Sequence, residues 1–586
     1  MSAPGRSSRA ILAAVALALL PGAPVVAGDR VGEPAFQSRS TAVGSRGMAA
    51  TAHPLATQAA IDILKAGGSA VDAAIAANAV LGFVEPTGNG IGGDLFALVW
   101  DPQAKTVVGL DASGPAPAAV DPRALRRRHG DTIPAAGFDA VTVPGAVAGW
   151  AALHARYGRL PLADVLAPAI ALASQGVAMA PVIARYWTAN LEGFEQNQRQ
   201  IPDYARMRSL YAPWGRAPAP GDMFANPDLA ATYAMIAREG ADGFYKGAFA
   251  QDFEVFARRH RAPHRAADLA AMQAEWVQPL AVGYRGVTLW QIPPATQGVA
   301  TLQMARIAER FPLAELSEAD RLHVLIEAKK LAFADRARYL ADPRQTQVPV
   351  AHLLSDATIA ARAARISMER ALPDDVPATD PEEHSDTTYL ATADRSGMMV
   401  SLIQSNYRGM GSGVVVPRRA PVPGGAGTWG FMLQNRGAQF ALAPGAANVI
   451  APGKRPFHTI IPGMVTKGSE PFLAFGVMGG AMQPQGQMQV LVNLVDLGLN
   501  LQAAGDAPRF RHLGGPDPGD GVEAAPGLFL ERGIPPEVRE SLAARGHRLL
   551  DRHAHVGGYQ AVMWDAERRV WWGATEMRKD GVALGY

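Results

Sequence analysis

Cysteine is absent from this 586-residue sequence. Without thiols the chain has no disulfide, no cysteine nucleophile and no zinc site built from cysteine pairs. A strong charge of either sign is also missing, because 55 basic and 53 acidic residues leave a formal net charge of +2. This balance argues against a dedicated nucleic-acid-binding protein. We therefore expect the partners of the chain to be small molecules.

Hydrophobic runs long enough to cross a bilayer are lacking as well. The longest early run, Ile11 to Leu20, follows the basic Arg6 and Arg9 and precedes small residues that end at Ala27. It has about half of the ~20 residues that a membrane span needs. The arrangement predicts a secretory signal peptide over residues 1–27, with no membrane anchor after its removal. We expect an exported protein, either periplasmic or secreted.

The composition that is present, 48% hydrophobic and 18% charged, is typical of a globular protein with a large core. Alternating or continuous apolar runs predict strands, and apolar residues at helical spacing predict helices. The expected strands cover 48–51, 95–100, 106–110, 398–404, 414–417, 472–477 and 561–564. The expected helices cover 55–65, 70–81, 144–157 and 162–173, with a mostly helical region over 181–282. This order suggests sheets stacked between helices.

The composition changes sharply between residues 371 and 386, which are rich in proline and acid. Such a segment is typical of a solvated linker. Thr387 and Thr388 follow it and open a predicted strand. A hydroxyl at this junction can attack the carbonyl of Asp386 and release the upstream chain, which leaves Thr387 with a free amine that serves as its own base. The junction therefore predicts cleavage between Asp386 and Thr387 without metal or cofactor, although a Thr-Thr pair is equally typical of an ordinary strand.

Two other patterns suggest ligands that their context disfavours. Residues 88–93 fit GxGxxG, but a dinucleotide-binding motif follows a strand and opens a helix, whereas here an apolar strand comes after the glycines. His260 and His264 have the spacing of zinc ligands on a helix, but Pro263 between them interrupts the helix that would align them. We expect neither a nucleotide cofactor nor a metal.

Several segments, taken together and in order, resemble the γ-glutamyltransferase family. They are Gly47–Ala50, Ala56–Gln58, Ile63–Ala74, Gly90–Phe96, Val143–Trp150, Asp386–Thr388, Ala451–Pro456 and Gly479–Gly480. The resemblance implies an α+β fold, the four-layer αββα sandwich of N-terminal-nucleophile hydrolases. It also implies a precursor that splits into a large subunit, 28–386, and a small subunit, 387–586, which stay together.

The same resemblance implies the catalytic residues. Thr387 takes the position of the family's nucleophile, and Ser405 takes that of a supporting hydroxyl eighteen residues further on. Gly479 and Gly480 match the paired glycines whose backbone N–H groups form the oxyanion hole, where such donors stabilise developing negative charge.

The substrate pocket departs from the family pattern. Ser113 stands where typical members have the arginine that binds the substrate's α-carboxylate, and Gln439 replaces the aspartate that receives the α-amino group. His458 and Thr459 replace a serine pair, and Tyr407 replaces an asparagine. The segment that forms a lid in some members is reduced to the run 441–451.

Three hypotheses about function follow. The first is a γ-glutamyl hydrolase or transferase that acts on glutathione-like peptides. The second is an acylase or amidohydrolase for amides that carry a carboxylate but no α-amino group, such as glutaryl or oxamate compounds. Arg436 favours it, because this cation adjoins a position that has lost its aspartate, and residues 433–437 resemble those branches of the family. The third is an inactive binding protein with the same fold.

Overall fold

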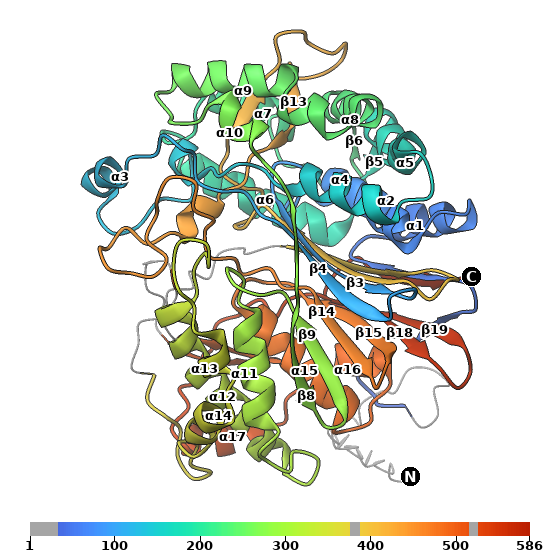
Figure 1. Ribbon diagram of the computed structural model, residues 1–586, viewed down its shortest axis with the longest axis vertical. Coiled ribbons are helices and arrows are strands. Elements are labelled where there is room, and N and C mark those ends of the chain that lie inside the picture. Colours follow the sequence, from blue (N-terminus) through green and yellow to red (C-terminus); the bar gives the residue numbers. More distant parts are fainter. Residues whose placement is uncertain (1–32, 375–386, 515–517, 519–525) are drawn as a thin grey trace, which may run out of the picture.

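Two seven-stranded antiparallel sheets stacked face to face form the centre of the molecule (Figure 1). The computed structural model describes residues 33–374, 387–514, 518 and 526–586. The predicted signal peptide, residues 375–386 of the predicted linker and Asp386 of the predicted cleavage site lie outside the described residues. No helix within the described part of the chain is both long and apolar enough to cross a membrane.

The first sheet, here called the nucleophile sheet, is built largely from the amino-terminal region and from the two strands that follow Thr387. Its strands in spatial order are β20 (Val582–Gly585), β2 (Met48–Thr51), β10 (Thr388–Ala393), β11 (Met399–Ser405), β3 (Asp94–Asp101), β4 (Thr106–Ala112) and β7 (Glu275–Val277).

The second sheet, here called the glycine-turn sheet, collects strands from both ends of the chain and from its middle. Its strands in spatial order are β1 (Ala42–Gly44), β19 (Val570–Thr575), β18 (Tyr559–Asp565), β15 (Glu470–Val477), β14 (Gly463–Lys467), β9 (Val287–Gln291) and β8 (Leu280–Tyr284). Three strand pairs lie outside both sheets: β5 (Val177–Ala178) with β6 (Met223–Phe224), β12 (Val415–Pro417) with β13 (Thr428–Met432), and β16 (Phe510–Leu513) with β17 (Gly527–Leu530).

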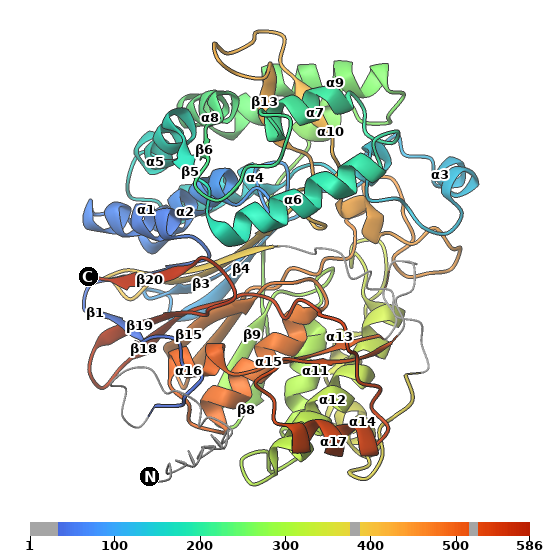
Figure 2. The same ribbon diagram turned by 180° about the vertical axis from the view of Figure 1, so that it is seen from behind.

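Helices cover the outer face of each sheet, as the two opposite views in Figures 1 and 2 show. On the side of the nucleophile sheet lie α1 (Pro54–Lys65), α2 (Ala70–Val84), α4 (Ala146–Tyr157), α5 (Leu162–Gln175), α6 (Pro181–Gln196), α7 (Tyr204–Tyr211), α8 (Pro227–Tyr245), α9 (Ala248–Arg259) and α10 (Ala266–Ala270), with α3 (Pro122–His129) at the edge. On the other side lie α11 (Gly298–Ala308), α12 (Glu318–Tyr339), α13 (Val350–Leu353), α14 (Asp356–Ala363), α15 (Met482–Val495), α16 (Leu501–Asp506) and α17 (Pro536–Ala544). The predicted α+β fold with four layers, αββα, is confirmed.

Helix α2 shows how local sequence and burial agree. Ser69 and Asp72 form a reciprocal capping box that satisfies backbone N–H groups at the helix start. The helix is apolar apart from Asp72 and Asn78, and every one of its residues is buried. Such a helix belongs in the interior rather than at the surface. It packs against α1 and α5 on one side and against β10 and β11 on the other, which places a rigid support behind Thr387.

Most predicted elements are found, with ends that differ by no more than three residues. The region 181–282 is mostly helical, as expected, with α6 to α10, but it also contains the short strand β6 and ends in β7 and the start of β8. Alternate residues of β8 are buried, which is the pattern of a strand with one solvated face. Strands β9, β14, β19 and β20 were not expected, because short segments of this kind carry little local signal.

Candidate active site

The two predicted catalytic hydroxyls lie side by side at one end of the nucleophile sheet. Antiparallel pairing of β10 with β11 sets Thr388 opposite Gln404, and this register brings Thr387 next to Ser405. The Thr387 Oγ1 donates a hydrogen bond of 3.4 Å to Ser405 Oγ, and both residues are buried. A buried hydroxyl at the start of a paired strand is held in place by the backbone ladder, as a nucleophile requires.

Asp94 continues this row across a third strand, because β11 pairs with β3 and sets Ser405 opposite Asp94. Asp94 lies within the motif Gly90–Phe96, from which no role for its carboxylate was predicted. The glycines before it permit close packing: a Cβ on Gly93 would lie 2.4 Å from the Ser405 carbonyl oxygen, and a Cβ on Gly92 would lie 2.0 Å from that of Met432. The GxGxxG segment lies between α2 and β3, in an order of helix, loop and strand that is the reverse of a dinucleotide-binding unit.

Tyr407 and Gln439 are brought together above Ser405. The Tyr407 backbone N–H donates to Ser405 Oγ at 2.8 Å, and the Gln439 side-chain amide donates to the Tyr407 hydroxyl at 2.6 Å. Tyr407 has a φ of 83°, a left-handed conformation that is rare for a residue with a side chain. Backbone strain of this kind gathers at functional sites, where the surrounding structure holds it.

Gly479 and Gly480 form the turn between β15 and α15, with φ values of 105° and 57°. The positive φ values explain the need for glycine at this turn. The side-chain amide of Gln297 donates to the carbonyl of Gly480 at 2.9 Å and to that of Thr459 at 2.6 Å, which ties the turn to a pocket segment. Since the turn lies at a helix amino terminus, its backbone N–H groups face a region that favours negative charge.

Arg436 lies in the short 3₁₀ helix η2 (Arg436–Gln439) and is fully buried. Its Nη1 donates to Thr459 Oγ1 at 3.0 Å, its Nε lies 4.0 Å from Asp94 Oδ2, and its guanidinium lies over the Tyr407 ring at 4.7 Å. Its Nε and Nη2 have no hydrogen-bond partner among the described residues. Burial lowers the pKa of Arg436 to about 10, and the nearby Asp94 carboxylate opposes this shift.

His458 is also fully buried and bridges two oxygen atoms. Its Nε2 lies 2.9 Å from Asp94 Oδ2, and its Nδ1 lies 2.7 Å from the Pro456 carbonyl oxygen. The ring thus links the Asp94 carboxylate to the backbone just before His458.

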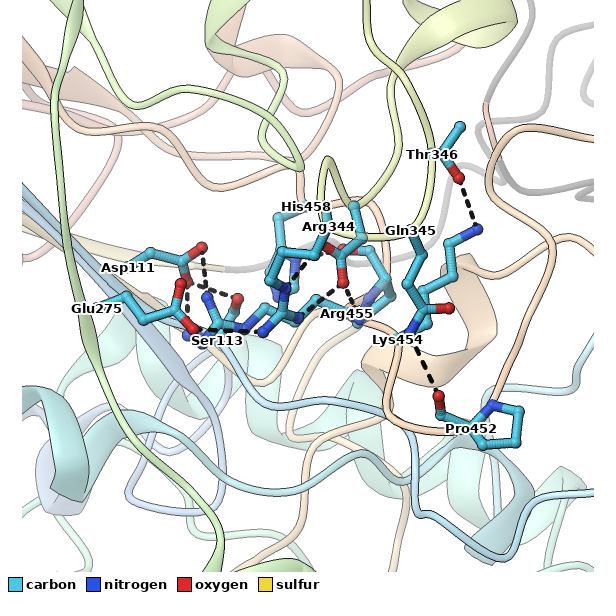
Figure 3. Close-up of polar contacts among 12 residues, drawn as sticks. Asp111, Ser113, Glu275, Arg344, Gln345, Thr346, Pro452, Lys454, Arg455 and His458 are labelled. Carbon is cyan, nitrogen blue, oxygen red and sulfur yellow. Dashed lines mark hydrogen bonds and ion pairs between the residues drawn. The ribbon is translucent and has the colours of Figure 1, made fainter.

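Ser113 belongs to a neighbouring ionic network (Figure 3). Its Oγ donates to Asp111 Oδ1 at 2.6 Å, while Asp111 Oδ2 pairs with Arg455 at 2.9 Å. Arg455 also pairs with Glu275 at 2.9 Å. The Ser113 hydroxyl therefore belongs to this network. The backbone N–H of the next residue, Gly114, donates to Asp94 Oδ1 at 2.8 Å.

The segment 441–451, which replaces the longer lid of some relatives in the sequence-based interpretation, is tied down at both ends. Ala441 forms an isolated β-bridge with Val449, and Leu442 and Ile450 are buried in a small apolar cluster with Phe440.

Among the described residues, one group of side chains has ligand atoms close enough together for a metal ion: His323, Glu327 and His547. These side chains already contact protein partners, since His323 Nδ1 lies 2.7 Å from His547 Nε2 and Glu327 pairs with Lys330 at 3.0 Å. The histidines considered in the sequence are not part of this group. His264 instead contacts the Val141 carbonyl at 2.9 Å.

Comparison with known proteins agrees with this architecture. The family model described as Gamma-glutamyltranspeptidase matches residues 56–586. The chain is 34% identical over 556 residues to the oxamate amidohydrolase proenzyme of Klebsiella pneumoniae subsp. pneumoniae, covering 93% of this chain and 100% of that protein. It is 33% identical over 552 residues to the glutathione hydrolase-like YwrD proenzyme of Bacillus subtilis, covering 93% and 99%.

Among solved structures, the cephalosporin acylase from Bacillus halodurans matches with a TM-score of 0.84 and 39% identity, covering 94% of this chain and 97% of that one. The family match spans nearly the whole described chain, and the structural match spans both sheets and their helical layers. This protein is therefore an enzyme of the γ-glutamyltranspeptidase family of N-terminal-nucleophile hydrolases.

Proposed function

We propose that the enzyme cuts its own chain before Thr387 and then hydrolyses an amide through an ester on the Thr387 hydroxyl. The observation that supports this most directly is the buried Thr387 Oγ1, 3.4 Å from Ser405 Oγ at the start of β10. In the first reaction, Oγ1 attacks the Asp386 carbonyl, the peptide C–N bond breaks, and water hydrolyses the resulting ester. The products are a large subunit that ends at Asp386 and a small subunit that begins with Thr387.

In the second reaction, the free amine of Thr387 takes the proton from its own hydroxyl, and Oγ1 attacks the substrate carbonyl. Backbone N–H groups of Gly479 and Gly480 stabilise the negative charge on the carbonyl oxygen. The amine leaving group takes up the proton, and water then releases the acyl group from Thr387. In this scheme Ser405 and the Tyr407 N–H orient the reacting hydroxyl.

Intact mass tests the proposed self-cleavage. We expect two fragments in the wild-type protein, with the smaller one starting at Thr387. We expect Thr387→Ala to remain uncut and to lose at least about 10³-fold in kcat, because no hydroxyl remains to attack. Thr387→Ser keeps a hydroxyl and serves as the matched variant that still cuts itself. Normal cleavage of Thr387→Ala would contradict the proposal.

The acyl group that we propose carries a carboxylate and no α-amino group, as glutaryl and oxamate compounds do. Arg436 supports this, since it is buried with two guanidinium nitrogens that have no hydrogen-bond partner among the described residues. A substrate carboxylate can form a charge-assisted pair with these groups. An α-ammonium placed beside Gln439 would face an uncharged amide, and burying a charge without a partner costs several kcal/mol.

The Asp94 carboxylate is bound mainly by groups other than Arg436, so it does not neutralise the guanidinium. Its Oδ1 accepts hydrogen bonds from Gly114 N and Gln434 Nε2, and its Oδ2 pairs with His458 at 2.9 Å, closer than the 4.0 Å to Arg436. The similarity to an oxamate amidohydrolase also favours this substrate class, because oxamate is an amide with a carboxylate and no α-amino group.

Hydrolysis of γ-glutamyl groups from glutathione-like peptides is the second candidate, favoured by the similarity to the glutathione hydrolase-like YwrD proenzyme. Matched glutaryl and γ-glutamyl anilides distinguish the two. We expect a higher kcat/KM for the glutaryl compound, and a loss of about tenfold or more for it in Arg436→Ala. A clear preference for the γ-glutamyl compound would overturn the proposed substrate class.

We also infer export, from the predicted signal peptide over residues 1–27. Amino-terminal sequencing of the large subunit from the producing cells tests this. A mature start near Gly28 is the expected result, and a start at the initiating methionine would contradict it.

A further inference from the structure

Asp94 is a fully buried carboxylate that has no function in the proposed reaction. It is the first residue of β3 and lies in the same row as Ser405 and Thr387. An uncompensated buried carboxylate is costly, and one that is kept in a core normally has several donors. Its partners therefore indicate what it holds in place.

The partners come from three chain segments that each carry or adjoin a predicted substrate-binding residue. The Gly114 N–H donates to Oδ1 at 2.8 Å and follows Ser113. The Gln434 side-chain amide donates to Oδ1 at 3.0 Å, two residues before Arg436. His458 Nε2 donates to Oδ2 at 2.9 Å and precedes Thr459. One carboxylate on the strand that pairs with β11 thus joins these three segments.

Asp94 also completes the set of contacts around the Arg436 guanidinium. The Tyr407 ring lies against its face at 4.7 Å, Thr459 Oγ1 accepts from Nη1, and Asp94 Oδ2 lies 4.0 Å from Nε. The guanidinium is therefore contacted on its face, by a hydrogen bond at Nη1 and by a carboxylate 4.0 Å from Nε, and together these contacts set the direction of Nη2. Nη2 has no hydrogen-bond partner among the described residues.

We infer that Asp94 is a positioning residue that holds Arg436 in the orientation needed to receive the carboxylate of the acyl group. The inference rests on the proposed role of Arg436 in substrate binding. It assigns Asp94 no contact with the reacting atoms. Its effect is transmitted through Arg436, so the loss of Asp94 has little consequence for binding once Arg436 is gone.

Calorimetric titration of glutarate into the processed enzyme tests this in a double-mutant cycle. Asp94→Asn is nearly isosteric and keeps an acceptor for Gly114 and Gln434, but it removes the charge beside Arg436. We expect the Kd for glutarate to rise about tenfold in Asp94→Asn and at least as much in Arg436→Ala. In the double variant we expect no further rise beyond that of Arg436→Ala, since coupled residues are not additive.

Asp228→Asn is the matched control. Asp228 is another fully buried carboxylate that joins distant segments, with Oδ2 accepting from Ala426 N, Thr428 N and Thr428 Oγ1 at 2.8–3.0 Å. It lies at the start of α8, outside the pocket contacts described above. We expect this variant to lower the Tm while the Kd for glutarate stays within about twofold of wild type, because a purely structural loss does not reorient Arg436.

Three results would overturn the inference: an unchanged Kd in Asp94→Asn, losses from Asp94→Asn and Arg436→Ala that multiply in the double variant, or no binding of either glutarate or glutamate to the wild type. Tighter binding of glutamate than glutarate would instead overturn the proposed substrate class. The same double-mutant cycle, run with glutamate, would then test whether Asp94 positions Arg436. If Asp94→Asn does not fold, Asp94→Ser, which is smaller and admits water, replaces it in the cycle.

Discussion

The two sheets contribute to the candidate active site in different ways. The nucleophile sheet supplies Thr387, Ser405 and Asp94 from the ends of three adjacent paired strands. The glycine-turn sheet supplies Gly479 and Gly480 from a turn, and the segment before its strand β14 supplies His458 and Thr459. The proposed nucleophile thus lies next to a backbone ladder, whereas the proposed oxyanion donors and the predicted substrate-binding residues His458 and Thr459 depend on turn conformation and side-chain hydrogen bonds.

This difference has a consequence for substitutions. On the nucleophile sheet a single hydroxyl can be removed without moving the backbone, because strand pairing remains. At the glycine turn the proposed functional groups are backbone N–H donors, so a new side chain there acts by changing the backbone conformation that aims them. Single substitutions in each sheet test this contrast.

Apart from the loss of Thr387 itself, the largest effect is expected at the glycine turn. Gly479 has a φ of 105°, which strains any residue with a side chain, so Gly479→Ala should rotate the turn and misdirect its N–H donors. We expect kcat to fall about 10²-fold in single-turnover or steady-state assays. Gly468→Ala is the control, since Gly468 also has a positive φ, 59°, but lies in the turn joining β14 to β15 with open space around its Cα. Equal kcat losses in both variants would remove the special role of Gly479.

A smaller effect is expected from Ser405 on the nucleophile sheet. Ser405→Ala removes the hydroxyl 3.4 Å from Thr387 Oγ1 while β11 keeps its pairing. We expect self-cleavage to slow and kcat to fall about tenfold, as the loss of one orienting hydrogen bond predicts. Ser405→Thr should retain most of the activity. Ser401→Ala on the same strand removes a buried hydroxyl that contacts Tyr389, and a similar kcat loss there would show that the effect is not local to Thr387.

The smallest effect is expected on folding stability in acid, from two buried histidines on the side of the glycine-turn sheet. Burial, reinforced by nearby lysines, lowers the pKa of His512 and of His547 to about 3, so both are neutral when folded. An unfolded histidine has a pKa near 6.5 and binds a proton first as the pH falls. Their contribution to stability is therefore complete above about pH 6.5 and declines below it, by up to about 1.4 kcal/mol per pH unit for each group.

His547→Gln checks this prediction, because the amide can still contact His323 but does not titrate. We expect a smaller fall in Tm between pH 7.5 and pH 5 for His547→Gln than for the wild type, measured by calorimetry. An identical fall would show that His547 does not contribute to the acid sensitivity.

Individual residues show how far sequence reasoning reached. The hydrophobic periodicity predicted β2, β3, β4 and α1 with nearly correct ends, since each has a strong local pattern. It missed β9, β14 and β19, although each forms a hairpin with a neighbouring strand, and it missed β20, whose partner β2 lies near the other end of the chain. It also took 275–282 for part of a helical region, although these residues form an edge strand and the start of another.

The sequence by itself determined the absence of thiol chemistry, the acidic junction before Thr387, and the family motifs that identified Ser405, Gly479 and Arg436 as residues of interest. These features are local, so residue type and spacing are enough to recognise them. Only the tertiary structure decided which of these residues meet. The contacts of Asp94 with Gly114, Gln434 and His458 span from 20 to 364 positions, and no local pattern encodes them. They arise because strand register and sheet stacking, which depend on burial across the whole core, bring distant polar groups to one buried point.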